Sequence, residues 1–176
     1  MSDLSKRELP ATQSLILERD ESVLKIWFNR PEAKNALSAE MTDEFGLVLD
    51  TVRDDRSIRT IVLRGAGGVF CAGGDIKGFK SGMQATDADE VAASNRSFGD
   101  LMIKLNEQPQ VVIVLVEGAA IGGGLGLACV GDVTLVTADA RFRLSETSLG
   151  IPPAQIAPFV TERVGLTQAR RLMLTG

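Results

Sequence analysis

Two clusters of glycine, each placed soon after a short apolar run, constrain the fold of this chain more than any other feature. The apolar run 60–64 leads into the glycine-rich stretch 65–74, and the run 111–116 is followed by the glycine-rich stretch 122–126. Glycine allows the tight turns and close backbone contacts that follow a buried strand. A strand, a tight turn and then a helical segment are typical of a parallel sheet with crossover connections. We therefore predict an α/β domain.

The remaining periodic segments support the same class. Residues 14–19 and 23–28 predict a β-hairpin, and Ser38 is placed to cap a helix. The run 111–116 is continuously apolar, which predicts a strand buried on both faces. Further strands are predicted at 132–137 and 141–144, and further helices at 87–108, 156–164 and 167–174. Residues 1–13 form a predicted N-terminal tail, which leaves one domain over 14–176.

The composition excludes several kinds of site. The chain has 176 residues, a net charge of −4 and no histidine. Histidine-based triads and histidine-ligated zinc sites are therefore excluded, no metal is expected, and protons must move through carboxylates, lysine, cysteine or water. The acidic balance offers no basic surface for nucleic acid or an anionic membrane. Cys71 and Cys129 form no paired motif, and with no targeting segment visible they favour a cytoplasmic location.

One segment is apolar enough to be weighed as a membrane span. Residues 111–131 carry Glu117 as their single charge and contain GxxxG patterns. Glu117 and Gly118 interrupt this segment, and its glycines weaken a single long helix. A buried strand, a turn and a buried helix explain the segment better, so no membrane contact is predicted.

The glycine-rich loops can also do chemistry through their backbone. The first loop does not match a dinucleotide fingerprint, because Phe70 stands at the third glycine position, and no Walker A lysine follows. The second, Gly122-Gly123-Gly124, directly precedes a helix, whose first N–H groups can bind an anion. Two such loops facing each other would form an oxyanion hole for an enolate. The alternative is that the glycines only permit tight turns, and spacing alone leaves both interpretations open.

Three motifs, read in order, resemble one known family. They are Asn29-Arg30-Pro31-x-x-Lys34-Asn35-Ala36-Leu37, Phe70-Cys71-Ala72-Gly73-Gly74-Asp75-Ile76 and Glu117-Gly118-x-x-x-Gly122-Gly123-Gly124. From about Leu15 onward the chain resembles the enoyl-CoA hydratase/isomerase (crotonase) family. The resemblance implies a spiral of ββα units with two roughly perpendicular sheets. It also implies an acyl-CoA thioester as the substrate, with no separate cofactor because coenzyme A is part of that substrate.

The resemblance also assigns site residues by their position in these motifs. The oxyanion amides would be those of Gly74 and Gly123. The implied substrate-binding residues follow the path of the coenzyme: Ala33, Lys34, Ala72, Gly73, Asp75, Ile76, Lys77 and Gly122. Lys77 would lie near the CoA phosphates. Lys34 is the alternative phosphate partner, since Glu32 stands where the family often has a basic residue.

The catalytic carboxylates show a departure from the family. Typical hydratases of this family use two glutamates, of which the first falls at Gly126 here and the second at Glu146. The resemblance implies that Glu146 is the general acid/base, with a pKa raised by burial. The alternatives are a surface carboxylate without a catalytic role, Glu117 as a substitute base, and Cys71 as a nucleophile. The last two fit the residues less well.

The loss of a carboxylate at Gly126 bears on the choice of substrate. A substrate with its own carboxylate would no longer be repelled, and Gly126 is expected to leave space for it. Residues 146–158 are similar to bacterial isohexenylglutaconyl-CoA and methylglutaconyl-CoA hydratases of acyclic terpene and leucine breakdown. We therefore expect hydration of a 3-substituted glutaconyl-CoA. A Δ3,Δ2-enoyl-CoA isomerase using Glu146 alone and a catalytically idle acyl-CoA-binding domain stay open as alternatives.

The chain is also shorter than members of this family. The resemblance implies that a C-terminal helical part is absent, which would complete the active site and form the contacts of a homo-trimer or hexamer. Apolar surface is expected to be exposed where those helices would pack.

Overall fold

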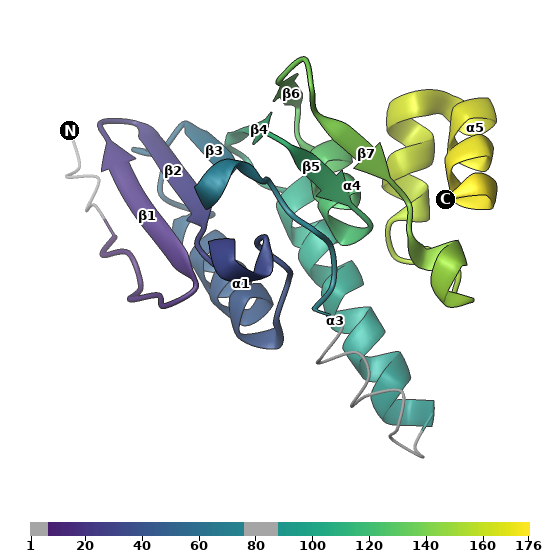
Figure 1. Ribbon diagram of the computed structural model, residues 1–176. Helices are drawn as coiled ribbons and strands as arrows, with labels where there is room; N and C mark the ends of the chain where they lie inside the picture. The colour runs from purple at the N-terminus through teal and green to yellow at the C-terminus, as the bar shows by residue number, and fades with distance from the viewer. Residues whose placement is uncertain (1–6, 76–87) are drawn as a thin grey trace.

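The computed structural model describes residues 7–75 and 88–176, which form two sheets and the helices packed on them (Figure 1). The larger sheet has the strand order β1-β2-β3-β4-β6. Its strands are β1 (Leu15–Asp20), β2 (Val23–Phe28), β3 (Thr60–Gly65), β4 (Val111–Val116) and β6 (Val133–Val136). β1 and β2 pair antiparallel as the predicted hairpin, and all other pairs are parallel. This pairing confirms the α/β class.

The parallel strands are joined by helices, as their direction requires. α1 (Ala39–Val52) connects β2 to β3, α3 (Ala88–Asn106) precedes β4, and α4 (Gly123–Val130) lies between β4 and β6. Ser38 caps α1 as predicted, because its Oγ accepts a hydrogen bond from the Met41 amide at 3.2 Å.

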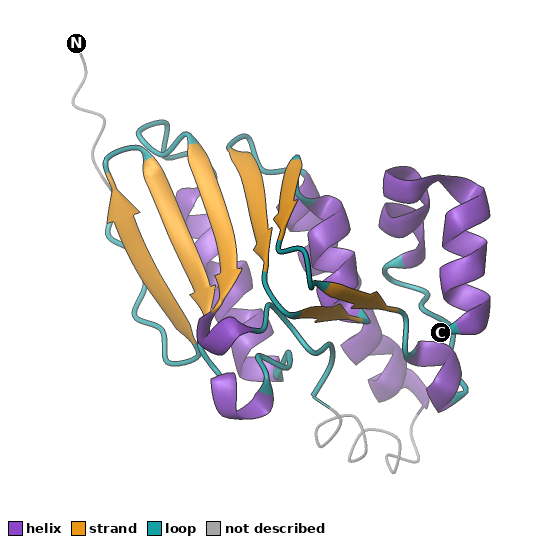
Figure 2. Cartoon of the chain, turned by 45° about the horizontal axis from the view of Figure 1, so that its top comes forward, coloured by secondary structure: helices purple, strands orange, loops and turns teal. Residues whose placement is uncertain are grey.

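The hydrophobic core lies between the larger sheet and these helices (Figure 2). Phe28 of β2 sits at its centre, with its ring centroid 5.7 Å from that of Phe45 and 5.5 Å from that of Phe70. Phe45 comes from α1, and Phe70 from the first glycine-rich loop. The loop is thereby anchored in the core by its one large side chain.

The opposite face of the larger sheet is less covered than the sequence predicts. On β4 only Val112, Val114 and Val116 are buried, whereas Val111 is 48% exposed. The expectation that this strand is buried on both faces is therefore wrong for the described residues, since the helices cover one face alone. Ile113 and Leu115 pair with two residues of β6, Val133 and Leu135, of which Leu135 is 57% exposed.

The second sheet is small and runs across the direction of the first (Figure 2). Its strands are β5 (Ala119–Ile121) and β7 (Arg141–Arg143), paired in parallel. The segment 111–131 is thus divided into β4, β5 and α4, as the sequence favours. Among the residues described, no helix combines the length and the apolar character needed to cross a membrane.

The chain ends in α5 (Ala157–Thr175), which is broken at Gly165 into two arms that lie side by side (Figure 1). Gly165 has φ 76° and ψ 158°, a conformation that a side chain would strain. The two arms correspond to the two predicted helices. Three short 3₁₀ turns complete the described elements: η1 (Pro31–Ala33), η2 (Ala66–Gly68) and η3 (Glu146–Leu149).

A buried amide, Asn35, joins the turn 29–35 to the first glycine-rich loop. Its side chain is fully buried, donating to the carbonyl oxygens of Ala66 at 2.8 Å and Val69 at 2.6 Å. Its Oδ1 accepts from the Arg30 amide at 2.9 Å. A single side chain thus satisfies three backbone groups that would otherwise be buried without partners.

We expect Asn35→Asp to lower the free energy of unfolding by about 3 kcal/mol. The substitution places an oxygen where the amide NH₂ faces two carbonyl oxygens, so donors are lost and acceptors confront one another. Urea unfolding followed by circular dichroism measures the change. The exposed control Asn106→Asp should cost less than about 1 kcal/mol. Equal losses in the two variants would contradict this account of Asn35.

Candidate active site

The two glycine-rich loops meet through backbone pairing. The Cys71 amide donates to the Ala119 carbonyl at 3.0 Å, and the Ile121 amide donates to the Cys71 carbonyl at 2.9 Å. Gly73 has φ 91°, and a Cβ there would lie 2.8 Å from the Ile121 carbonyl oxygen. The first loop can therefore lie against Ile121 and Gly122 only because glycine stands at this position.

The backbone N–H of Gly74 points away from Leu37, the residue with which Gly74 forms a parallel bridge. The Leu37 amide donates to the Gly73 carbonyl at 2.8 Å, and the Asp75 amide donates to the Leu37 carbonyl at 3.0 Å. In such a parallel bridge the N–H of the intervening residue points to the other side. Gly74 is exposed, and its N–H has no acceptor in the part of the chain that the structure describes.

The second loop places Gly123 in the first turn of α4. Gly122 is the N-cap with φ 51°. Its carbonyl accepts the first hydrogen bond of the helix, from the Gly126 amide at 3.1 Å. The amides at the start of a helix have no intrahelical acceptor and lie at the positive end of the helix dipole. Apolar side chains stand close by, since a Cβ on Gly123 would be 3.0 Å from Phe98 and 3.1 Å from Leu37.

Glu146 is brought to this helix end by β7. The ladder of β5 and β7 continues to a hydrogen bond from the Gly122 amide to the Arg143 carbonyl at 2.8 Å, and Glu146 follows three residues later. Its Oε1 lies 2.8 Å from the position of a Cβ on Gly122. Its Oε2 is buried without a hydrogen-bond partner. Burial raises the pKa of this carboxyl above its usual value of 4.5.

Arg30 supports the first loop through contacts that the sequence pattern does not predict. Its guanidinium donates to the Ala36 carbonyl at 2.6 Å and forms an ion pair with Asp75 at 3.0 Å. Both partners flank the bridge between Leu37 and Gly74, so the arginine braces the segment that carries the Gly74 amide. The first motif contains this arginine, but nothing in its spacing points to Asp75.

The predicted coenzyme path is partly described. Ala33 is half-buried in η1 and Lys34 is exposed, while the Lys34 carbonyl accepts from the Ala72 amide at 3.0 Å. The first motif and the first loop are thereby side by side. Ile76 and Lys77 lie outside the described residues. No group of acidic or sulfur ligands able to hold a metal is present among the residues described.

Comparison with known proteins identifies the family of this chain. The model of the enoyl-CoA hydratase/isomerase family matches residues 18–176. The chain belongs to this family. Its members bind acyl-CoA thioesters.

The relatives also confirm the crotonase-like fold. Pseudomonas aeruginosa AtuE is 57% identical with a TM-score of 0.89, and the match covers 93% of this chain and 63% of that one. An enoyl-CoA hydratase/isomerase from Marinobacter aquaeolei is 49% identical with a TM-score of 0.88, covering 93% and 63% of the two chains. Carnitinyl-CoA dehydratase of Proteus mirabilis is 41% identical over 81% of this chain and 52% of its own length. This enoyl-CoA hydratase/isomerase chain therefore spans between half and two thirds of these relatives.

The surroundings of Gly126 correct one expectation. A Cβ at Gly126 would overlap Cγ2 of Ile156, lie 3.0 Å from its Cβ and lie 3.2 Å from Cε of Met102. Ile156 is 3% exposed, so its side chain fills the place beside α4. The absence of a carboxylate at Gly126 stands, but the expected free space for a substrate carboxylate does not exist there.

The structure also bears on the alternative catalytic groups. Glu117 forms two hydrogen bonds with Arg64, at 2.8 and 2.9 Å, and this partner lowers the pKa of its carboxyl. Cys71 is buried, and burial raises the pKa of its thiol to about 12. An ion-paired carboxylate and a protonated thiol are poor choices for a base and a nucleophile.

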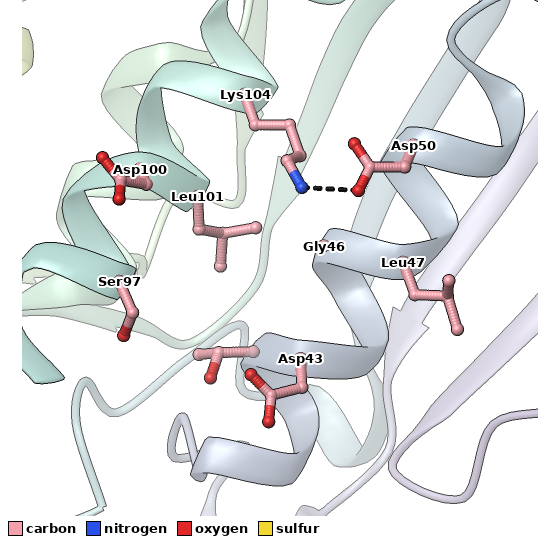
Figure 3. A pocket seen from close by; sticks show the side chains of 9 residues that line it. Asp43, Gly46, Leu47, Asp50, Ser97, Asp100, Leu101 and Lys104 are labelled. Carbon is pink, nitrogen blue, oxygen red and sulfur yellow. Dashed lines mark hydrogen bonds and ion pairs between the residues drawn. The ribbon is translucent and has the colours of Figure 1, made fainter.

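A hollow between α1 and α3 is separate from this site (Figure 3). Its volume is about 380 Å³, and the carboxylates of Asp43, Asp50 and Asp100 lie around it. Lys104 bridges to Asp50 at 2.7 Å across the hollow. None of its lining residues belongs to the glycine-rich loops, so it adds nothing to the acyl-CoA site.

We expect Gly126→Ala to lower the free energy of unfolding by about 1–2 kcal/mol. Alanine favours a helix, but here its methyl group would overlap the packed side chain of Ile156. Thermal or urea unfolding measures the change, alone and in an Ile156→Ala background that removes the overlap. The cost should shrink markedly in that background.

Gly46 is the matched control for this test. It lies in α1, where a Cβ would meet its nearest atoms at 3.7 Å, an ordinary contact. Gly46→Ala should therefore stabilise the protein by up to about 1 kcal/mol. If Gly126→Ala stabilises as much as Gly46→Ala does, the described packing of Ile156 is wrong.

Proposed function

We propose that the protein hydrates the double bond of an α,β-unsaturated acyl-CoA, with Glu146 as general acid/base and the Gly74 and Gly123 amides as oxyanion donors. The observation that carries this proposal is the Glu146 carboxyl, half-buried beside the N-terminus of α4 with one oxygen lacking a partner. A buried polar atom without a partner in a site of this kind is a group held ready for a reactant.

The proposed reaction uses one carboxylate twice. Glu146 takes a proton from water as the water oxygen bonds to C3 of the thioester, and the double-bond electrons move onto the carbonyl oxygen as an enolate. The two amides donate hydrogen bonds to that oxygen in a surrounding of low polarity formed by Leu37 and Phe98. Protonated Glu146 then returns the proton to C2. A raised pKa of Glu146 suits both steps, because the carboxyl must accept the proton from water and then release the same proton to C2.

The proposed substrate class is supported by the lack of a second carboxylate at Gly126. Gly126 and Ile156 stand where a second carboxylate would repel an acidic acyl chain. Without that negative charge, the proposed site can accept a 3-substituted glutaconyl-CoA. The similarity of residues 146–158 to hydratases of such thioesters favours the same class. The 41% identical relative named as carnitinyl-CoA dehydratase supports water loss or addition as the type of reaction.

An isomerase is the second candidate, and the single carboxylate favours it. Moving a double bond needs one group that removes a proton from C2 and returns it at C4. Glu146 meets that need without a second carboxylate at position 126. Incubation with a 3-enoyl-CoA distinguishes the two, because only isomerisation produces the conjugated thioester absorbance.

We expect Glu146→Gln to lower kcat by about 10²- to 10⁴-fold while binding of the acyl-CoA is retained. In the unmodified protein, kcat/KM should rise with pH along a limb centred above 4.5, since the base acts when ionised and burial raises the pKa of this carboxyl. Steady-state hydration assays and isothermal titration with a saturated acyl-CoA measure these quantities.

The control for this test is Glu117→Gln, at the ion-paired carboxylate. It should leave turnover essentially unchanged, because Glu117 is held by Arg64. Acyl-CoA binding without any turnover in the unmodified protein would instead identify an idle acyl-CoA-binding domain.

We expect a 3-methylglutaconyl-CoA to be hydrated with a higher kcat/KM than crotonyl-CoA. The proposed reason is that the site lacks the second negative charge which excludes an acidic chain. A panel of enoyl-CoA thioesters, assayed in both directions, measures the ratio. A clear preference for crotonyl-CoA would overturn the substrate assignment but not the hydratase.

A further inference from the structure

The end of the Gln155 side chain packs directly on Gly99 of α3, a position that we call the seat. A Cβ at Gly99 would overlap the Oε1 of Gln155 and lie 3.0 Å from its Cδ. Gly99 is buried, so the glutamine side chain covers it directly. The amide can take this position because α3 has no side chain there.

This seat borders the residues around the proposed reaction site. Phe98 precedes Gly99 on α3 and stands 3.0 Å from the Cβ position of Gly123. Met102, one turn further along α3, stands 3.2 Å from the Cβ position of Gly126. The helix on which Gln155 packs therefore also supplies the apolar side chains of Phe98 and Met102 beside α4.

The residue that follows Gln155 fixes its backbone. Ile156 is buried, with its side chain packed against Gly126 of α4. The dipeptide 155–156 thus rests on one glycine of α3 and one glycine of α4. This double contact holds the glutamine at a defined place beside both helices.

The amide of Gln155 has no hydrogen-bond partner within the described part of the chain. It is half-buried, and its Oε1 lies directly against Gly99. An amide carries two donor hydrogens and an acceptor oxygen, and the polar atoms of Gln155 are not among the buried atoms that lack a partner, so they are accessible to a ligand.

We propose that the Gln155 side-chain amide donates a hydrogen bond to the distal carboxylate of the substrate and so determines specificity for an acidic acyl chain. The inference rests on the proposed function. Gly126 and Ile156 remove the charge that would repel such a chain, but an apolar surface gives a carboxylate no partner. Gln155 supplies that partner as a neutral group that does not disturb the pKa of Glu146 through a charge.

The first test is Gln155→Leu, which keeps the volume and removes the amide. We expect kcat/KM for 3-methylglutaconyl-CoA to fall roughly 10- to 100-fold, the effect of losing one hydrogen bond to a charged group. The value for crotonyl-CoA, which has no distal carboxylate, should stay within a few-fold. The exposed glutamine of α5 provides the control Gln168→Leu, which should change neither value.

The second test moves the amide without altering it. Gly99→Ala puts a methyl group into the seat, and the glutamine end is flexible enough to move away. The helix should tolerate or gain from the change. We expect the same selective loss on the acidic substrate, and no additional loss when Gly99→Ala is combined with Gln155→Leu.

The outcomes separate this inference from the proposed function. If the unmodified protein hydrates 3-methylglutaconyl-CoA but Gln155→Leu lowers the acidic and neutral substrates equally, Gln155 does not select the carboxylate. If the neutral primary-amide analogue of the substrate is hydrated as fast as the acid and is equally sensitive to Gln155→Leu, the recognised group is not a charge. If the unmodified protein hydrates no enoyl-CoA, the proposed function itself fails.

Discussion

The backbone bonds between Cys71 and the Ala119–Ile121 strand determine where every part of the candidate site lies. They join two loops that are about fifty residues apart in sequence, and they place Gly73 against Ile121. The same strand pairs with β7, and β7 leads directly to Glu146. A shift of one residue in this small sheet would turn the neighbouring groups to the opposite face, so its register controls the amides and the carboxyl together.

Close approach explains why the site is rich in glycine. Gly73 faces a carbonyl oxygen, Gly124 faces Cys71, and Gly126 and Gly99 face side chains of the segment after Glu146. Each of these positions has a different neighbour, but in all of them a Cβ would meet an atom at van der Waals overlap. The glycines of the second loop therefore do two things at once: they give α4 an unobstructed first turn, and they let three other segments reach it.

The sequence predicted the elements of this site better than the contacts among them. Local signals were sufficient for the hairpin, for the Ser38 cap of α1 and for the strand–turn–helix order, because each depends on a few neighbouring residues. The contact of Ile156 with Gly126 and the ion pair of Arg30 with Asp75 join distant segments, and no periodicity encodes them. The prediction that β4 is buried on both faces was also wrong, because a continuously apolar strand does not indicate which of its faces the helices cover.

The packing of Ile156 changes what the glycine at position 126 means for catalysis. A glycine that left a void would admit water beside α4, whereas the side chain of Ile156 fills the place next to Gly126. In the proposed reaction a single carboxylate leaves no second negative charge that would weaken the hydrogen bonds from the two amides to an enolate. Position 126 therefore adds an apolar contact with Ile156, and no second carboxylate, to the proposed site. Such a site suits the proposed chemistry in which Glu146 moves a proton back and forth, better than chemistry that divides the two proton transfers between two groups.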